Sequence, residues 1–131
     1  MKIAVVSDDG KNISQHFGRA PYYVVVTVEN GKITNRETRE KLAHGHGIGP
    51  ELHAHHGAGH GMGPAEHDRH VLMSQSITDC EAVICRGMGQ GAYVSMTAQG
   101  IRPVVTDLAD VDTAVTAYVA GDIVDHTERL H

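Results

Sequence analysis

Residues 82–100 read AVICRGMGQGAYVSMTAQG, and this stretch decides the fold class. Its first four residues are apolar, which is typical of a short strand buried on both faces. The glycine-rich segment 86–91 predicts a loop, and residues 92–99 are expected to form a helix that ends at Gly100. A strand that runs through a short loop into a helix is the repeating unit of α/β proteins with parallel strands.

Four more strands are predicted around this unit. Residues 3–7 form an apolar run, residues 22–28 are β-branched and aromatic, and residues 103–106 form another short run. Residues 33–41 are more polar and are therefore expected to form an edge strand. Asn30-Gly31 is the strongest short hairpin signal, so the first three strands are expected to form an antiparallel meander.

Two more helices complete the predicted order β-β-β-α-β-α-β-α. One spans residues 65–77 after Pro64, and the other spans residues 111–120 between a cap at Asp110 and a stop at Gly121. Right-handed crossovers make the first, fourth and fifth strands parallel, with helices on both faces. We therefore expect a single domain over residues 1–131, a three-layer α/β/α fold with a mixed five-stranded sheet. Residues 122–131 are expected to form a short tail with a final extended piece.

Composition excludes several classes of function. The chain has 131 residues and a net charge of −5, which argues against a nucleic-acid-binding surface. No apolar run approaches the roughly 20 residues that a membrane helix needs, and the start MKIAVVSDDG turns acidic too soon for a signal peptide. Cys80 and Cys85 are expected to be free thiols in a reducing cytoplasm.

The predicted topology brings several chemically useful residues to one edge of the sheet. The loop after the first strand carries His16, and the fourth strand ends at Cys85 and leads into Met88 and the glycines Gly87, Gly89 and Gly91. These residues are expected to line the crevice at a topological switch point, with the glycines supplying conformational freedom. The glycine loop has neither the Lys-Ser/Thr ending of a P-loop nor a dinucleotide fingerprint. Such a loop can bind any of several kinds of anion, including a negatively charged metal–sulfur cluster.

Two motifs give the chain a family resemblance. SQHFGRA at residues 14–20, together with CRGMGQGAY at residues 85–93, resembles the dinitrogenase iron–molybdenum cofactor biosynthesis family of NifX, NafY and the NifB C-terminal domain. The resemblance implies a ribonuclease H-like fold and a non-enzymatic carrier of iron–sulfur or iron–molybdenum cofactor precursors. It also implies partner proteins that donate and accept a metallocluster, with His16 as a candidate cluster ligand. A role in nitrogen fixation does not follow from the resemblance.

Each of these residues also has a purely structural interpretation. His16 would then fix a turn, Cys85 would be a small buried hydrophobe, and Met88 would fill the core. Asp8 and Asp9 would bind Mg²⁺ in a nuclease of this fold, but the other strand ends lack the carboxylates that two metal ions need. We expect these aspartates to shape a turn instead.

A histidine- and glycine-rich insert at about residues 43–64 departs from the plain family pattern. Eight of the eleven histidines lie in or just after it, namely His44, His46, His53, His55, His56, His60, His67 and His70. Neutral imidazoles bind divalent metals such as Zn, Ni, Cu or Fe, so the segment is expected to capture metal. The alternative interpretation is that the segment is a solvated low-complexity loop with no role in metal binding. The alternative function is a regulatory domain that senses metal or pH.

Overall fold

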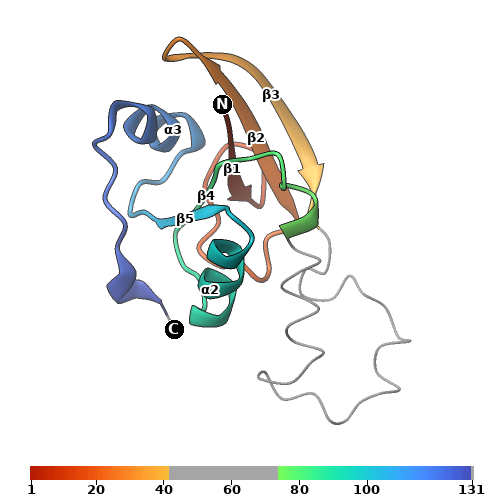
Figure 1. Ribbon diagram of the computed structural model, residues 1–131, viewed down its shortest axis with the longest axis vertical. Coiled ribbons are helices and arrows are strands. Elements are labelled where there is room, and N and C mark those ends of the chain that lie inside the picture. The colour runs from red at the N-terminus through yellow and green to blue at the C-terminus, as the bar shows by residue number, and fades with distance from the viewer. Residues whose placement is uncertain (42–73, 131) are drawn as a thin grey trace.

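The protein is seen in a computed structural model that describes residues 1–41 and 74–130. The strands are β1 (Lys2–Ser7), β2 (Tyr22–Glu29), β3 (Lys32–Glu40), β4 (Ala82–Cys85) and β5 (Arg102–Val105), and they form one five-stranded sheet in the order β3-β2-β1-β4-β5 (Figure 1). The helices are α2 (Gln90–Ala98), α3 (Val111–Ala120) and the short 3-10 helix η2 (Thr127–Arg129). The sheet is mixed, because β1 is antiparallel to β2 and parallel to β4.

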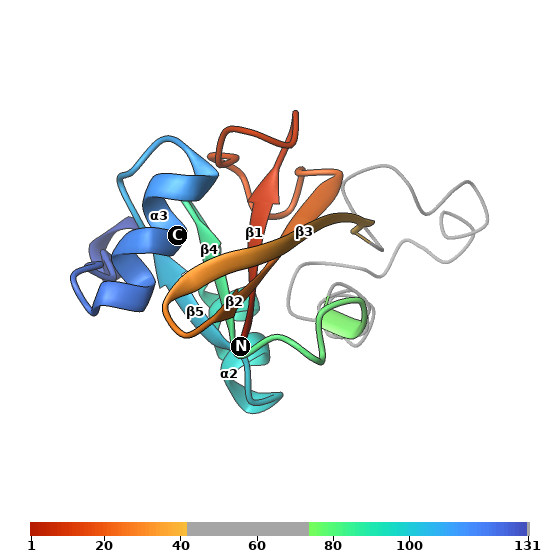
Figure 2. The same cartoon turned by 90° about the horizontal axis from the view of Figure 1, so that it is seen from above.

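The two helices α2 and α3 cover opposite faces of the sheet, and Figure 2 shows them on different sides of the strands. Alternate residues of β1 point to the two faces, so Ala4 and Val6 pack with α2 whereas Ile3 and Val5 pack with α3. Full burial of one such Val or Ile side chain contributes about 1.5–3 kcal/mol. The predicted three-layer α/β/α class with a mixed five-stranded sheet is confirmed.

The antiparallel half follows the sequence signals closely. Glu29 pairs with Lys32, so the hairpin turn consists of Asn30 and Gly31 alone. Their φ angles of 53° and 76° are those of a type I′ turn, which matches the twist of the flanking strands. β3 lies at the edge of the sheet and is mostly exposed, as its polar sequence predicts.

In the parallel half, α3 has the predicted boundaries. Asp110 accepts a hydrogen bond from the Thr113 N–H at 3.0 Å, and Gly121 ends the helix with a φ of 80°. The helix α2 begins at Gln90, two residues earlier than predicted, because Gly89 rather than Gly91 is the N-cap. Gly91 therefore lies in the first helical turn and not in the helix interior, where a glycine costs roughly 0.5–1 kcal/mol relative to Ala.

Two other expectations fall partly or wholly outside the described residues. The predicted helix over 65–77 lies mostly outside them; residues 74–75 are helical and residues 76–79 form a turn. The insert at 43–64 lies wholly outside them. The tail forms η2, and it has no strand in its described part, residues 122–130. Among the helices that the structure describes, none has the length and apolar character needed to cross a bilayer.

Candidate functional site

The two sequence motifs meet at one edge of the sheet. β1 and β4 are parallel, so Ser7 and Cys85 end at the same edge. The chain after β1 turns back there, and the Ser14 N–H donates to the Val6 carbonyl at 2.9 Å. The Arg86 N–H then donates to the Ser14 carbonyl at 3.1 Å, which joins the two motifs directly. The predicted convergence of these two loops at the end of β1 is therefore present.

Gly87 is the point of closest approach between the motifs. A Cβ atom built on Gly87 would lie 2.5 Å from the Gln15 carbonyl oxygen, which is too close for any side chain. The Gly87 carbonyl in turn accepts a hydrogen bond from the Phe17 N–H at 3.1 Å. We expected Gly87, Gly89 and Gly91 to supply unusual backbone angles, but none of the three has a positive φ. For Gly87 the requirement is space, not conformational freedom.

His16 is exposed at this edge, and its backbone makes the turn. The His16 N–H donates to the Ser14 hydroxyl at 3.1 Å, and the His16 carbonyl accepts from the N–H groups of Arg19 and Ala20, each at 3.1 Å. Within residues 1–41 and 74–130 the imidazole has no hydrogen bond. The ring is therefore not needed to hold the loop, and neither of its nitrogens is bonded to the described residues.

The glycine loop ends at the N-terminus of α2, whose N-cap is Gly89. No described side chain caps this end, and the first helical bond is donated by Tyr93 to the Gly89 carbonyl at 3.1 Å. The N–H groups of Gln90, Gly91 and Ala92 thus have no carbonyl within the helix to bond. Gln90 and Gly91 are exposed, so this turn presents backbone donors and the positive end of the helix dipole.

Cys85 and Met88 lie in the core on the α2 side of the sheet, where they are 0% and 1% exposed. Burial raises the pKa of the Cys85 thiol to about 12, and the thiol points at the Val104 carbonyl at 3.9 Å. The thiol is therefore protonated at neutral pH and enclosed in the core, and not exposed in the crevice where the sequence placed it. Cys80 is also buried, and both cysteines are free, as predicted.

The charge distribution around this edge was not recognised in the sequence, although it is readable there. Residues 10–28 and 82–106, which contain both motifs, have no acidic side chain, in a chain with 16 acidic residues. The carboxylates at this edge come from the flanking segments, from Asp9 and from Asp125, and both accept hydrogen bonds there. Arg86 lies between the motifs, and its Nε is buried with no hydrogen-bond partner in the part of the chain that the structure describes. An unpaired guanidinium nitrogen is costly to bury and favours a negatively charged neighbour.

The end of β3 lies at the same edge. The Lys41 N–H donates to the Pro21 carbonyl at 2.9 Å, and the Lys41 ammonium lies 4.8 Å from the centre of the Phe17 ring.

Lys41 is the last described residue before the histidine-rich segment. The eight candidate metal-ligating histidines, His44 to His70, lie outside the described residues. Among the residues that are described, no group of three or more His, Cys, Asp or Glu side chains is arranged to hold a metal ion.

Asp9 shapes the turn after β1, as expected. Its carboxylate accepts hydrogen bonds from the backbone N–H groups of Lys11 and Asn12 at 2.9 and 2.8 Å. These bonds hold the pKa of the Asp9 carboxyl well below its usual range.

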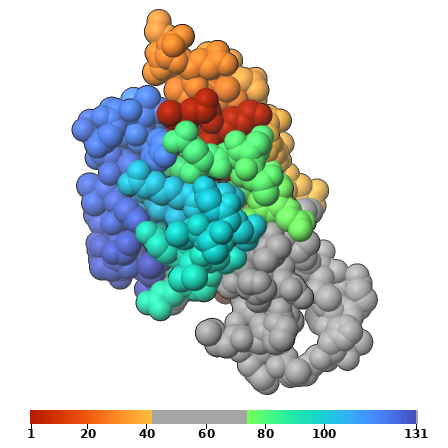
Figure 3. All heavy atoms as spheres, in the orientation of Figure 1, coloured from red at the N-terminus to blue at the C-terminus, as the bar shows by residue number. Residues whose placement is uncertain are grey.

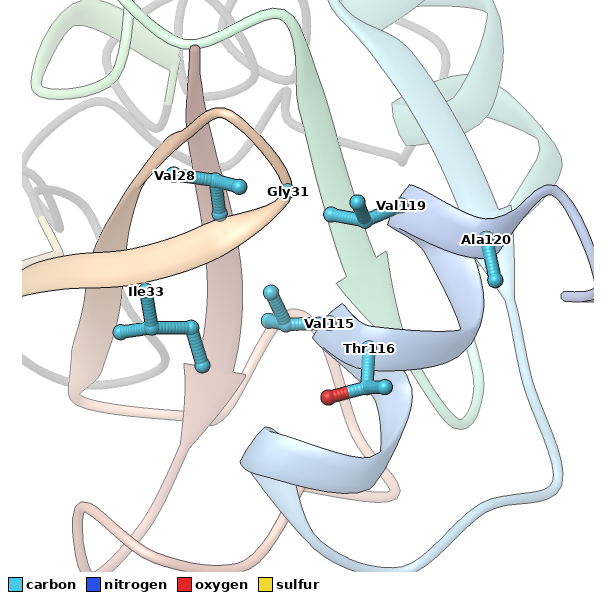
Figure 4. Close-up of a pocket in the computed structure, with 7 residues that line it drawn as sticks. All are labelled: Val28, Gly31, Ile33, Val115, Thr116, Val119 and Ala120. Atoms are coloured by element: carbon cyan, nitrogen blue, oxygen red, sulfur yellow. The ribbon is translucent and has the colours of Figure 1, made fainter.

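An apolar hollow of about 290 Å³ lies away from this edge, between the hairpin tip and α3 (Figure 4). Val28 and Ile33 line it from the hairpin, and Val115 and Val119 line it from α3. Its lining includes no titratable side chain, so it offers packing space but no reactive group.

Comparisons with known proteins agree with the architecture. The family model described as "Dinitrogenase iron-molybdenum cofactor" matches residues 1–121. An uncharacterized protein of Methanocaldococcus jannaschii, MJ0580, is 27% identical over 125 residues, which cover 94% of this chain and 89% of that protein.

Two solved structures are similar in fold. The apo form of the orange protein from Desulfovibrio gigas has a TM-score of 0.66 at 20% identity, covering 93% of this chain and 89% of that one. A candidate NifB protein from Thermotoga has a TM-score of 0.61 at 22% identity, covering 96% and 93% of the two chains. At such identities the structures establish the fold alone, whereas the family model spans both motifs and every strand of the sheet. The chain therefore belongs to the dinitrogenase iron–molybdenum cofactor family.

Proposed function

We propose that this protein is a non-enzymatic carrier or scaffold for an iron–sulfur or iron–molybdenum type cluster, or for a precursor of one. Its partners would be the proteins that donate and accept the cluster, in the cytoplasm. Family membership supports this role. The observation that carries it is the bonded contact between the Phe17 N–H and the Gly87 carbonyl. It holds the loop with the exposed His16 against the loop that leads into α2.

The donor set at this edge suits an anionic cluster better than a bare cation. His16 would supply a neutral imidazole ligand, while Arg86 and the N–H groups at the start of α2 would face the negative charge of the cluster. Cys85 and Met88 are kept as candidates only for a state in which the core opens, because both are buried. Gly87 and Gly89 would set the distance of the backbone from the cluster, and Gly91 would expose a backbone donor.

Weak attachment is useful in a carrier. Iron–sulfur clusters are ordinarily held by four cysteine thiolates. A cluster that is held by one imidazole and by hydrogen bonds keeps most of its coordination positions open. An acceptor protein with thiolates could then remove it without first breaking strong bonds.

The histidine-rich segment would capture free metal independently of this edge. Its eight histidines suffice for one closed tetrahedral site and even for two. Metal binding there is expected to weaken as the pH falls through the histidine range, because protonated rings do not ligate.

Anaerobic purification with iron, molybdenum and sulfide analysis tests the proposal. It is followed by reconstitution with ferrous iron and sulfide, and separately with tetrathiomolybdate. His16→Ala should lower cluster content or affinity by at least about tenfold, since even an outer-sphere partner of a metal ligand is worth that much. His16→Cys, which offers a thiolate in place of the imidazole, should restore binding. Deleting residues 44–63 should leave cluster binding intact and lower the uptake of Zn²⁺ or Ni²⁺.

Two results would refute the proposal. One is that neither His16→Ala nor the deletion changes the metal and sulfide content. The other is that the deletion alone abolishes all binding, which would place the binding activity in the histidine-rich segment and not at the edge of the sheet.

A further inference from the structure

The C-terminal strap, residues 122–130, bonds to the outer side of β5 at Val105, and in Figure 3 its atoms lie beside those of α2. β5 is the last strand of the sheet, so the outward backbone groups of Val105 need partners from elsewhere. The Val105 N–H donates to Asp125 Oδ1 at 2.9 Å, and the Val105 carbonyl accepts from the His126 N–H at 2.7 Å. Both outward groups of Val105 are therefore bonded to the strap.

The carboxylate of Asp125 has a second function at the start of α2. Its other oxygen, Oδ2, accepts a hydrogen bond from the Tyr93 hydroxyl at 2.8 Å, which raises the pKa of Tyr93. Tyr93 donates the first helical hydrogen bond to Gly89, so it belongs to the turn whose N–H groups face the proposed ligand. One carboxylate thus connects the end of β5 to the end of the glycine loop.

Asp125 also lies near the end of β4. Its negative charge adds to the effects of burial in raising the pKa of Cys85. Two more contacts hold the strap in this place. Ile123, before Asp125, packs against the α3-side core, and Leu130, after it, packs against the α2-side core together with Tyr93. The strap is therefore fixed at both ends around Asp125.

We propose that Asp125 is a positioning residue for the glycine-loop site, and that docking of the strap is coupled to ligand binding at that loop. The inference rests on the proposed function, because it assigns a ligand to the loop. Donors that bind an anion must be held in a fixed direction before the ligand arrives, or part of the binding energy is lost in ordering them. By linkage, a bound ligand stabilises the docked strap to the same extent.

The test compares Tyr93→Phe, Asp125→Ala and the double variant with Tyr118→Phe in the full-length protein. Tyr118 is a matched control, because its hydroxyl donates to Glu81 Oε2 at 2.9 Å and it packs with the α3-side core. Two properties are measured besides thermal stability. They are the amide NMR shifts of Gly89 and Gly91, and the dissociation constant for tetrathiomolybdate as the probe.

Tyr93→Phe and Asp125→Ala should each shift the two glycine amides and weaken probe binding by roughly threefold to tenfold, the effect of one hydrogen bond. The double variant should be no worse than the poorer single variant, because both changes break the same connection. Tyr118→Phe should lower stability without either effect.

The inference is overturned if Tyr93→Phe and Asp125→Ala lower stability but leave the glycine amides and the probe affinity as they are in Tyr118→Phe. Absence of probe binding in the unaltered protein counts against the proposed function. In that case the amide shifts alone decide whether Asp125 positions the loop.

Discussion

The Phe17 N–H donates a hydrogen bond to the Gly87 carbonyl at 3.1 Å, across a separation of seventy residues in the chain. This bond fixes the two loops in register with each other at the end of β1. It makes the geometry of the site depend on backbone contacts, which most side-chain substitutions leave intact.

Gly87→Ala is expected to separate the two loops. The new Cβ would lie 2.5 Å from the Gln15 carbonyl oxygen, so one loop must shift. We expect a loss of about 1–3 kcal/mol of unfolding free energy, as in other overpacked sites. Urea denaturation measures it. Gly18→Ala is the control in the same motif, because nothing lies within 4 Å of its added Cβ. Equal effects of the two substitutions would contradict the close-approach argument.

Arg86→Gln is expected to weaken the binding of an anionic cluster without loss of stability. Its Nε has no hydrogen-bond partner among the described residues, so the folded chain gains little from the charge. A charge-assisted hydrogen bond to a ligand contributes about 1.5–3 kcal/mol, so tetrathiomolybdate affinity should fall at least tenfold. Arg102→Gln is the matched control at the opposite end of the sheet, where Arg102 lies over the Tyr118 ring at 5.9 Å. A parallel loss in both variants would indicate a general charge effect.

Alkaline pH is expected to destabilise the protein through Cys85. Its pKa is raised by burial to about 12 in the folded protein, whereas a thiol in the unfolded chain titrates near about 8.5. The folded state holds the proton more tightly, so this contribution is complete below about pH 8.5 and is lost as the pH rises toward 12.

Urea midpoints measured at rising pH should therefore decline above about pH 8.5, and the decline should be shallower in Cys85→Val. The remaining decline in that variant has a source in Cys80, whose pKa burial also raises to about 12. Rapid labelling of Cys85 by a thiol reagent in the native protein at neutral pH would show that the thiol is not enclosed.

Asp79 is expected to stabilise the protein in a way that is lost at low pH, whereas the contribution of Cys85 is lost at high pH. Arg39 holds the Asp79 carboxylate with bonds of 2.7 and 2.9 Å, and this pairing lowers the pKa of Asp79. The contribution is present above the unfolded pKa of about 3.9 and is lost as the pH falls below it. Because the Asp79 side chain is 43% exposed, we expect a coupling of at most about 1 kcal/mol. A double-mutant cycle with Asp79→Asn and Arg39→Gln, run at pH values on both sides of 4, measures it. A coupling that persists at low pH would contradict this account.

The fold was predictable because its signals are local or topological. Asn30-Gly31 determines the hairpin, Asp110 and Gly121 determine α3, and right-handed crossovers determine the parallel half of the sheet. The meeting of the two motif loops at one edge follows from the same reasoning.

Side-chain placement within the site was harder to predict, for a physical reason. β4 is apolar on both faces, so the pattern does not say which way Cys85 points or whether a helix covers it. The close contact of Gly87 with Gln15 depends on a distance of a few ångströms between segments far apart in sequence. The unpaired Nε of Arg86 likewise has no signal in a single sequence.

β1 leaves the ribosome before the other four strands of its sheet, yet it lies in the middle of the sheet with β4 as its second neighbour. The meander of β1, β2 and β3 is therefore complete while the inner edge of β1 still awaits residues 82–85. An apolar strand with an open edge readily recruits other chains. During translation the unpaired edge of β1 is therefore exposed until β4 has been made. A nascent chain that stops before Cys85 is expected to aggregate instead of folding.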